Sequence, residues 1–127
     1  MSIHKSGVLH AGLLINGDRT TITSTSAQLL NGEWHMCSIT YDGTIIKLYI
    51  NGVMEKSTPV SGTLNTSQSF IFGHYGSDTS YYCVDAAISD ARIYTTALTP
   101  EQIKELYNTS MTIDNNGNIH ARELVES

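Results

Sequence analysis

The chain has 127 residues, of which 40% are hydrophobic and 15% charged, and its net charge is −5. This length suits one domain with a short appendage, while the apolar content excludes disorder and the 7 scattered Lys and Arg residues argue against a nucleic-acid surface. No run reaches the roughly 18 apolar residues of a membrane helix and no export signal follows Met1, so we expect no membrane contact.

Turn dipeptides divide most of the chain into short β-strands. Asn-Gly and Asp-Gly pairs, which tolerate the positive φ of tight hairpins, occur at 16–17, 31–32, 42–43, 51–52 and 116–117. Runs rich in β-branched and aromatic residues accompany them and are the predicted strands: 8–15, 20–24, 34–41, 44–50, 69–73 and 82–94. This spacing predicts an all-β sandwich or barrel.

The predicted strands also supply the predicted core. In the run 44–50, Ile46, Leu48 and Ile50 fall on one face, as in a half-buried strand. Large apolar residues within these runs are expected to supply most of the core: Trp34, Ile39, Ile46, Leu48, Ile50, Phe70, Phe72, Ile88 and Ile93. We expect the two cysteines, Cys37 and Cys83, to be reduced core residues, because their spacing is not that of a metal site or a disulfide scaffold.

One helix and one hairpin follow the strands. Thr99 has the position of an N-cap, Pro100 that of the first helical residue and Gln102 that of a capping-box partner, which predicts a helix from Pro100 to about Tyr107. After it, alternating residues flank the 116–117 turn and predict a terminal β-hairpin. We therefore divide the chain into a sandwich over 1–108 and a hairpin tail over 109–127, which we expect to serve in assembly.

The polar residues offer little catalytic or metal chemistry. The carboxylates are dispersed, and Asp85 and Asp90 would lie on opposite faces of a regular strand, so we expect no enzyme. The histidines show no metal-ligand spacing, so we expect no cofactor and no zinc site.

The segment from residue 73 to residue 82 is the predicted ligand site, because it mixes aromatic rings with short polar groups between two strand-like runs. A pyranose offers apolar faces that stack on Tyr and hydroxyls that bond Asp or His, and loops on a rigid sandwich commonly carry such groups. The expected ligand-binding residues are His74, Tyr75, Asp78, Tyr81 and Tyr82. In the alternative interpretation, Tyr81 and Tyr82 only begin the next strand.

Four segments, 34–43, 46–52, 87–94 and 97–103, resemble the laminin G-like jelly-roll family (concanavalin A-like lectins and glucanases) in order and spacing. The resemblance implies an antiparallel jelly-roll β-sandwich that binds a glycan or another cell-surface ligand, with enzymes in the minority. It also implies calcium as an alternative ligand of the loop residues Asp18, Asp42 and Asp78, which the sequence does not favour because no two carboxylates identifiably converge. The family's usual opening strands before residue 8 are absent. The fold is then abridged, or the chain is a fragment, or a neighbouring subunit supplies the missing edge.

The tail segment 113–121 resembles β-turn segments of bacteriophage tail fibres and other virion proteins. We therefore expect a lectin-like, non-catalytic binding module for a surface glycan on a bacteriophage tail or virion, or outside the cell after lysis. The alternative is a purely structural virion or assembly protein. An uncovered sheet edge and an apolar tail hairpin predict a homo-oligomer, or contacts with other virion proteins.

Overall fold

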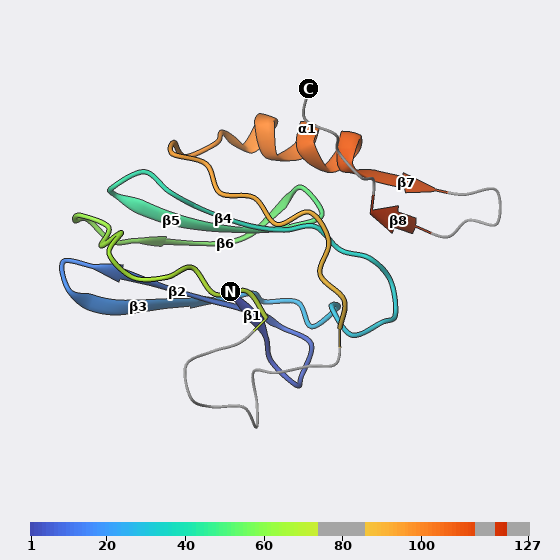
Figure 1. The fold of residues 1–127 in the computed structure, drawn as a ribbon, viewed down its shortest axis with the longest axis horizontal. Helices are drawn as coiled ribbons and strands as arrows, with labels where there is room; N and C mark the ends of the chain where they lie inside the picture. Colours follow the sequence, from blue (N-terminus) through green and yellow to red (C-terminus); the bar gives the residue numbers. More distant parts are fainter. Residues whose placement is uncertain (74–85, 114–118, 122–127) are drawn as a thin grey trace.

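The computed structural model describes residues 1–73, 86–113 and 119–121. Within them, three strands form one antiparallel sheet, sheet A, in the order β1-β2-β3, and three more form sheet B in the order β4-β5-β6. A helix and a two-stranded hairpin follow (Figure 1). The elements are β1 (Ser2–Ile3), β2 (Leu9–Ile15), β3 (Asp18–Thr23), β4 (Cys37–Tyr41), β5 (Ile45–Ile50), β6 (Val53–Pro59), α1 (Pro100–Ser110), β7 (Met111–Ile113) and β8 (Ile119–Ala121).

Two Asn-Gly turns connect one pair of neighbouring strands in each sheet, β2 with β3 and β5 with β6. Asn16 and Gly17 have φ of 53° and 85°, and Asn51 and Gly52 have φ of 52° and 77°, so each pair joins its strands by a turn with two positive φ angles. This geometry suits Asn-Gly because neither residue meets a large steric penalty there. The predicted tight turns at these two positions are confirmed.

The core lies between the two sheets. In β2, Leu9, Ala11 and Ile15 alternate toward sheet B and are at most 3% exposed, and Ile46, Leu48 and Ile50 of β5 face them at 0 to 1%. Period-2 alternation therefore gives each sheet one apolar inner face. Figure 1 shows the two sheets stacked, with β2 and β3 below β4, β5 and β6. The predicted all-β, two-sheet antiparallel sandwich is confirmed.

Helix α1 covers the outer face of sheet B (Figure 1). Its predicted capping box is present: Thr99 N donates to Gln102 Oε1 at 2.9 Å, and Gln102 N donates to Thr99 Oγ1 at 3.2 Å. Ile103, 3% exposed, is its buried residue. The helix extends three residues beyond the predicted end, to Ser110, and leads directly into the β7–β8 hairpin, which is also as predicted.

The strand prediction is wrong in the second half of the chain. Residues 69–73 and 86–94 form no strand, and four predicted core residues are exposed. These are Phe70 at 57%, Phe72 at 39%, Ile88 at 60% and Ile93 at 56%. Conversely, β1 and β6 were not predicted. The sequence of β6 is mostly polar, and its strand forms because the tight turn at 51–52 folds it back onto β5.

Among the described residues, no helix is long and apolar enough to cross a bilayer.

Candidate binding site

The predicted ligand residues His74, Tyr75, Asp78, Tyr81 and Tyr82 all lie outside the described residues, but the chain on both sides of them is described. Gly73 N donates to the carbonyl of Met1 at 2.8 Å, and the Met1 amino group donates to the carbonyl of Ile71 at 2.9 Å. A Cβ on Gly73 would lie 3.2 Å from Ile88 Cδ1. The chain therefore enters the predicted loop beside the start of β1, and Ile88 lies close to Gly73.

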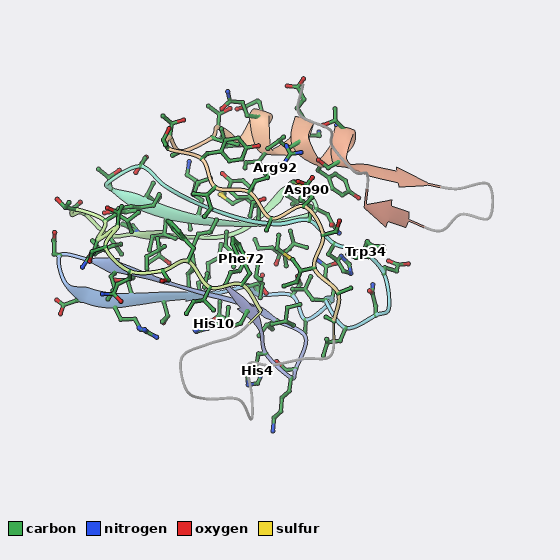
Figure 2. All side chains as sticks on the ribbon, viewed as in Figure 1. His4, His10, Trp34, Phe72, Asp90 and Arg92 are labelled. Carbon is green, nitrogen blue, oxygen red and sulfur yellow. The ribbon has the colours of Figure 1, made fainter. Side chains whose placement is uncertain are left out.

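A polar pocket lies close to this anchor, on the outer face of sheet A. Its volume is about 260 Å³ and its lining consists of His4, Ser6, Val8, His10 and Thr23. Ser2, next to the anchoring Met1, is the cross-strand partner of His10. Figure 2 shows His4 and His10 on the side of sheet A that faces away from sheet B.

Local hydrogen bonds hold both imidazoles of this pocket. His10 pairs with Thr23 across β2 and β3, and His10 Nδ1 lies 3.1 Å from Thr23 Oγ1. In the turn after β1, Ser6 N donates to His4 Nδ1 at 3.1 Å, and Ser6 Oγ lies 2.7 Å from the same nitrogen. Since His4 Nδ1 accepts a backbone N–H, the neutral ring carries its proton on Nε2.

The electrostatics of the pocket disfavour a charged His10. Burial is the main cause that lowers the pKa of His10 below 6.5, and the positive charges of the amino terminus, His4 and Arg19 lower it further. Burial likewise lowers the pKa of the Met1 amino group below 8.0. His10 is therefore neutral at pH 7.

A second hollow, of about 170 Å³, lies between sheet B and the start of α1. Its lining comprises residues of β4, β5 and their turn together with the segment before the helix: Thr40, Asp42, Ile45, Lys47, Ala97, Leu98, Thr99 and Pro100. Asp42 Oδ1 accepts hydrogen bonds from Thr44 N, Thr44 Oγ1 and Ile45 N at 2.8 to 2.9 Å. These bonds, the backbone one from Thr44 first, lower the pKa of Asp42, so this carboxylate holds the turn.

Two further described groups are the carboxylate of Asp90 and the thiol of Cys37. Arg92 donates to both carboxylate oxygens of Asp90, at 2.8 and 3.1 Å, and to the hydroxyl of Tyr94 at 3.4 Å. These hydrogen bonds, the one to Tyr94 first, raise the pKa of Arg92. Burial raises the pKa of the Cys37 thiol to about 12, so it is not a thiolate at neutral pH. Within the described ranges, no three His, Cys, Asp or Glu side chains are grouped as a metal site; of the calcium candidates, Asp78 lies outside those ranges.

The histidine pocket was not predicted from the sequence. His4 and His10 are six positions apart and Thr23 is thirteen further, so no motif joins them. The available signal was the alternation around His10, whose neighbours Leu9 and Ala11 are apolar and face inward. That pattern places His10 on the outer face of β2, but the register with β1 and β3 was needed to bring the other residues to it.

Comparisons with known proteins agree with this architecture. The family model described as "Concanavalin A-like lectin/glucanases superfamily" matches residues 5–104. The chain is similar to the crystal structure of an S-layer domain-containing protein from Clostridium thermocellum, with 31% identity and a TM-score of 0.51 over 80% of this chain. It spans about half of that structure, 52%. No curated protein matches. The chain belongs to the concanavalin A-like lectin/glucanase superfamily.

Proposed function

We propose that this chain is a non-catalytic, lectin-like module that binds a surface glycan. The main support for this proposal is that the start of the predicted ligand loop and a polar pocket both lie beside β1. Gly73, which precedes the predicted ligand residues, donates a hydrogen bond to the Met1 carbonyl, and the polar pocket is lined by His10, the cross-strand partner of Ser2. Membership of a superfamily that includes lectins supports a binding role.

The chemistry of the predicted loop suits a sugar. Tyr75, Tyr81 and Tyr82 offer rings that stack on the apolar face of a pyranose, and Asp78 accepts hydrogen bonds from its hydroxyls. The backbone bonds from Gly73 and Met1 tether one end of the loop to a rigid sheet, which lowers the ordering cost of binding.

A glycan array followed by calorimetry tests this function. We expect selective binding of one group of glycans, lost at least tenfold in Tyr75→Ala and in Asp78→Ala, since each removes a contact worth about 1.4 kcal/mol or more. Tyr94→Ala is the matched control, because Tyr94 is exposed but lies outside the loop. We also expect the purified protein to release no reducing sugar from any glycan that it binds. Unchanged affinity in both loop variants would contradict the proposed site.

We further place this module on a bacteriophage tail or another virion appendage, or outside the cell after lysis, because segment 113–121 resembles such proteins. Neighbouring reading frames that encode tail or capsid proteins would support this location. Neighbours that encode cell-wall enzymes or surface-anchored proteins would count against it.

A structural role in assembly is the second candidate, and the exposed apolar residues of the second half favour it. Phe70, Ile88 and Ile93 are each more than half exposed, which is typical of a surface that another subunit covers. Light scattering should then give an oligomer for the wild type and a monomer for a Phe70→Ser, Ile93→Ser double variant. Val53→Ser, at an exposed site in β6, is the control and should not change the mass. A monomeric wild type at high micromolar concentration would refute this role.

A further inference from the structure

The sequence holds four Asn-Gly pairs, of which 16–17, 31–32 and 51–52 are described by the structure and 116–117 is not. In such a pair the backbone nitrogen of the glycine can attack the side-chain carbonyl carbon of the asparagine, because glycine has no Cβ to hinder the approach. The attack closes a five-membered succinimide ring and releases ammonia. The described pairs therefore place the same reacting groups in different surroundings.

The pairs at 16–17 and 51–52 are held by contacts with distant segments. Both form tight turns between neighbouring strands, with Asn16 and Asn51 at φ of 53° and 52°. Asn16 Oδ1 accepts a hydrogen bond from Thr63 N at 2.9 Å, and Asn51 Oδ1 accepts one from Met36 N at 3.0 Å. Attack requires the side-chain carbon to approach the next backbone nitrogen, and turning either side chain that way would break these bonds.

The pair at 31–32 has different surroundings. It lies in segment 24–36, which contains no strand or helix and connects sheet A with sheet B (Figure 1). Asn31, Gly32 and Glu33 are exposed, and the described hydrogen bonds of the Asn31 side chain go to Glu33 and His35 of the same segment. No described hydrogen bond of this side chain therefore holds it to a strand.

A chain of hydrogen bonds determines which nitrogen of His35 carries the proton. Because Met36 N donates to Asn51 Oδ1 at 3.0 Å, the Asn51 amide presents its Nδ2 hydrogens to His35 Nδ1, which is 2.9 Å away. His35 Nδ1 is then the acceptor, and the neutral ring carries its proton on Nε2. This Nε2 lies 2.8 Å from Asn31 Oδ1 and donates to it.

Two donors thus converge on the side-chain carbonyl oxygen of Asn31. Besides His35, the backbone N of Glu33 donates to Oδ1 at 3.0 Å, while Asn31 Nδ2 donates to the Glu33 carboxylate at 3.2 Å. Attack on the side-chain carbon turns this carbonyl oxygen into an oxyanion, and donors already in place stabilise the new charge. The nitrogen that must leave lies beside a carboxylate that can relay a proton to it.

We propose that Asn31 is a self-modification site, at which His35 and Glu33 promote the loss of the side-chain amide. Gly32 N gives its proton to water and bonds to Asn31 Cγ. Asn31 Nδ2 takes up a proton from water through the Glu33 carboxylate and leaves as ammonia, so the Cγ–Nδ2 bond breaks as the succinimide forms. Water then opens the ring at either carbonyl and leaves aspartate or isoaspartate at position 31. The net reaction consumes water and releases ammonia.

The product changes the connection between the two sheets. A carboxylate replaces the amide that donates to Glu33, so an attractive contact becomes a repulsion between like charges. Isoaspartate also lengthens the main chain of segment 24–36 by a methylene group. We therefore expect the modification to loosen this segment. It goes beyond the proposed glycan binding and does not depend on it.

Peptide mapping by mass spectrometry, after incubation of the full chain at neutral pH, tests the proposal. In the folded protein, Asn31 should convert at least about tenfold faster than Asn16 and Asn51, because only its reacting groups are both assisted and released from strand contacts. In urea the rates at the three sites should become similar, since each is then only an asparagine followed by glycine. Fragmentation that separates aspartate from isoaspartate identifies the products.

Variants test the role of each neighbour. His35→Ala should slow conversion of Asn31 about fivefold; an enclosed oxyanion donor contributes about a hundredfold or more, but this segment is open to water. Glu33→Gln should slow it about threefold, because the new side chain still accepts the bond from Nδ2 but relays no proton. His4→Ala is the matched control, since His4 contacts Ser6 in another turn, and it should leave the rate unchanged.

The wild-type comparison needs no variant, so the proposal stays testable even if His35→Ala does not fold. Similar rates at Asn31, Asn16 and Asn51 in the folded protein would overturn the proposed site. An unchanged or faster rate in His35→Ala with a native circular dichroism spectrum would also overturn it, because the imidazole would then not assist the reaction. Either result leaves the proposed glycan binding unaffected.

Discussion

The two sheets of the sandwich use their outer faces differently. On sheet B, α1 and the segment before it cover the outer face, and Tyr49 of β5 is 1% exposed there (Figure 1). On sheet A, no described helix covers the outer face, and it carries the histidine pocket and the exposed Arg19. One outer face thus extends the core, while the other presents polar groups in the part of the chain that the structure describes.

The largest expected effect comes from the covered face. Tyr49→Ala should lower the free energy of unfolding by about 4 kcal/mol, because it removes a buried aromatic ring and leaves a cavity. Leu14→Ala is the counterpart on the outer face of sheet A, where Leu14 is only partly buried, and should cost about 1 kcal/mol. Urea unfolding measures both. Equal losses of unfolding free energy in the two variants would mean that α1 does not bury the outer face of sheet B.

A pair of matched glycines tests how closely the helix approaches. Gly17 and Gly52 occupy the same position in two Asn-Gly turns, both with positive φ. A Cβ on Gly17 would meet nothing, whereas one on Gly52 would lie 3.1 Å from Tyr107 Cβ and 3.2 Å from Lys104 Cα. Gly17→Ala should cost about 1 kcal/mol from backbone strain alone, and Gly52→Ala about 1 to 2 kcal/mol more. Indistinguishable midpoints of thermal unfolding would contradict the helix position.

The start of the helix should give a smaller effect. Thr99→Ala removes the hydroxyl that accepts the hydrogen bond from Gln102 N and should cost about 1 kcal/mol. Thr96→Ala, at an exposed site three residues earlier, should cost less than about 0.5 kcal/mol. Chemical denaturation measures the free energy of unfolding of both variants. An equal loss of stability in the two would show that the capping box does not stabilise the helix.

The smallest expected change in the free energy of unfolding is that of Tyr49→Phe, and it should be a gain in stability. Among the described residues, the buried Tyr49 hydroxyl has no hydrogen-bond partner, and an unsatisfied buried hydroxyl costs free energy. Tyr49→Phe should therefore leave the unfolding free energy unchanged or raise it by about 1 kcal/mol. A destabilisation above about 1 kcal/mol would indicate that this hydroxyl is satisfied in solution.

The features that the sequence predicts well depend on near neighbours. The turns at 16–17 and 51–52 require only Asn followed by Gly, and the start of α1 requires only Thr99 and Gln102 at the right spacing. Each signal acts within four residues, so local chemistry determines it.

The features that the sequence does not predict depend on distant partners. The apolar run around Phe70 and Phe72 has the composition of a strand, but a strand also needs an edge with which to pair, and composition does not name that edge. The histidine pocket likewise requires the registers of β1, β2 and β3, which place His10 opposite both Ser2 and Thr23. The loop residues from His74 to Tyr82 remain a prediction.

Hydrogen exchange with and without a bound glycan tests most directly whether the outer face of sheet A is the binding face. The probe is the oligosaccharide with the strongest array signal, at saturating concentration. The account predicts slower exchange in peptides that cover residues 2–10 and 71–86, and no change in peptides that cover 97–107 at the start of α1. Protection confined to 97–107 would place the ligand on sheet B and contradict the account.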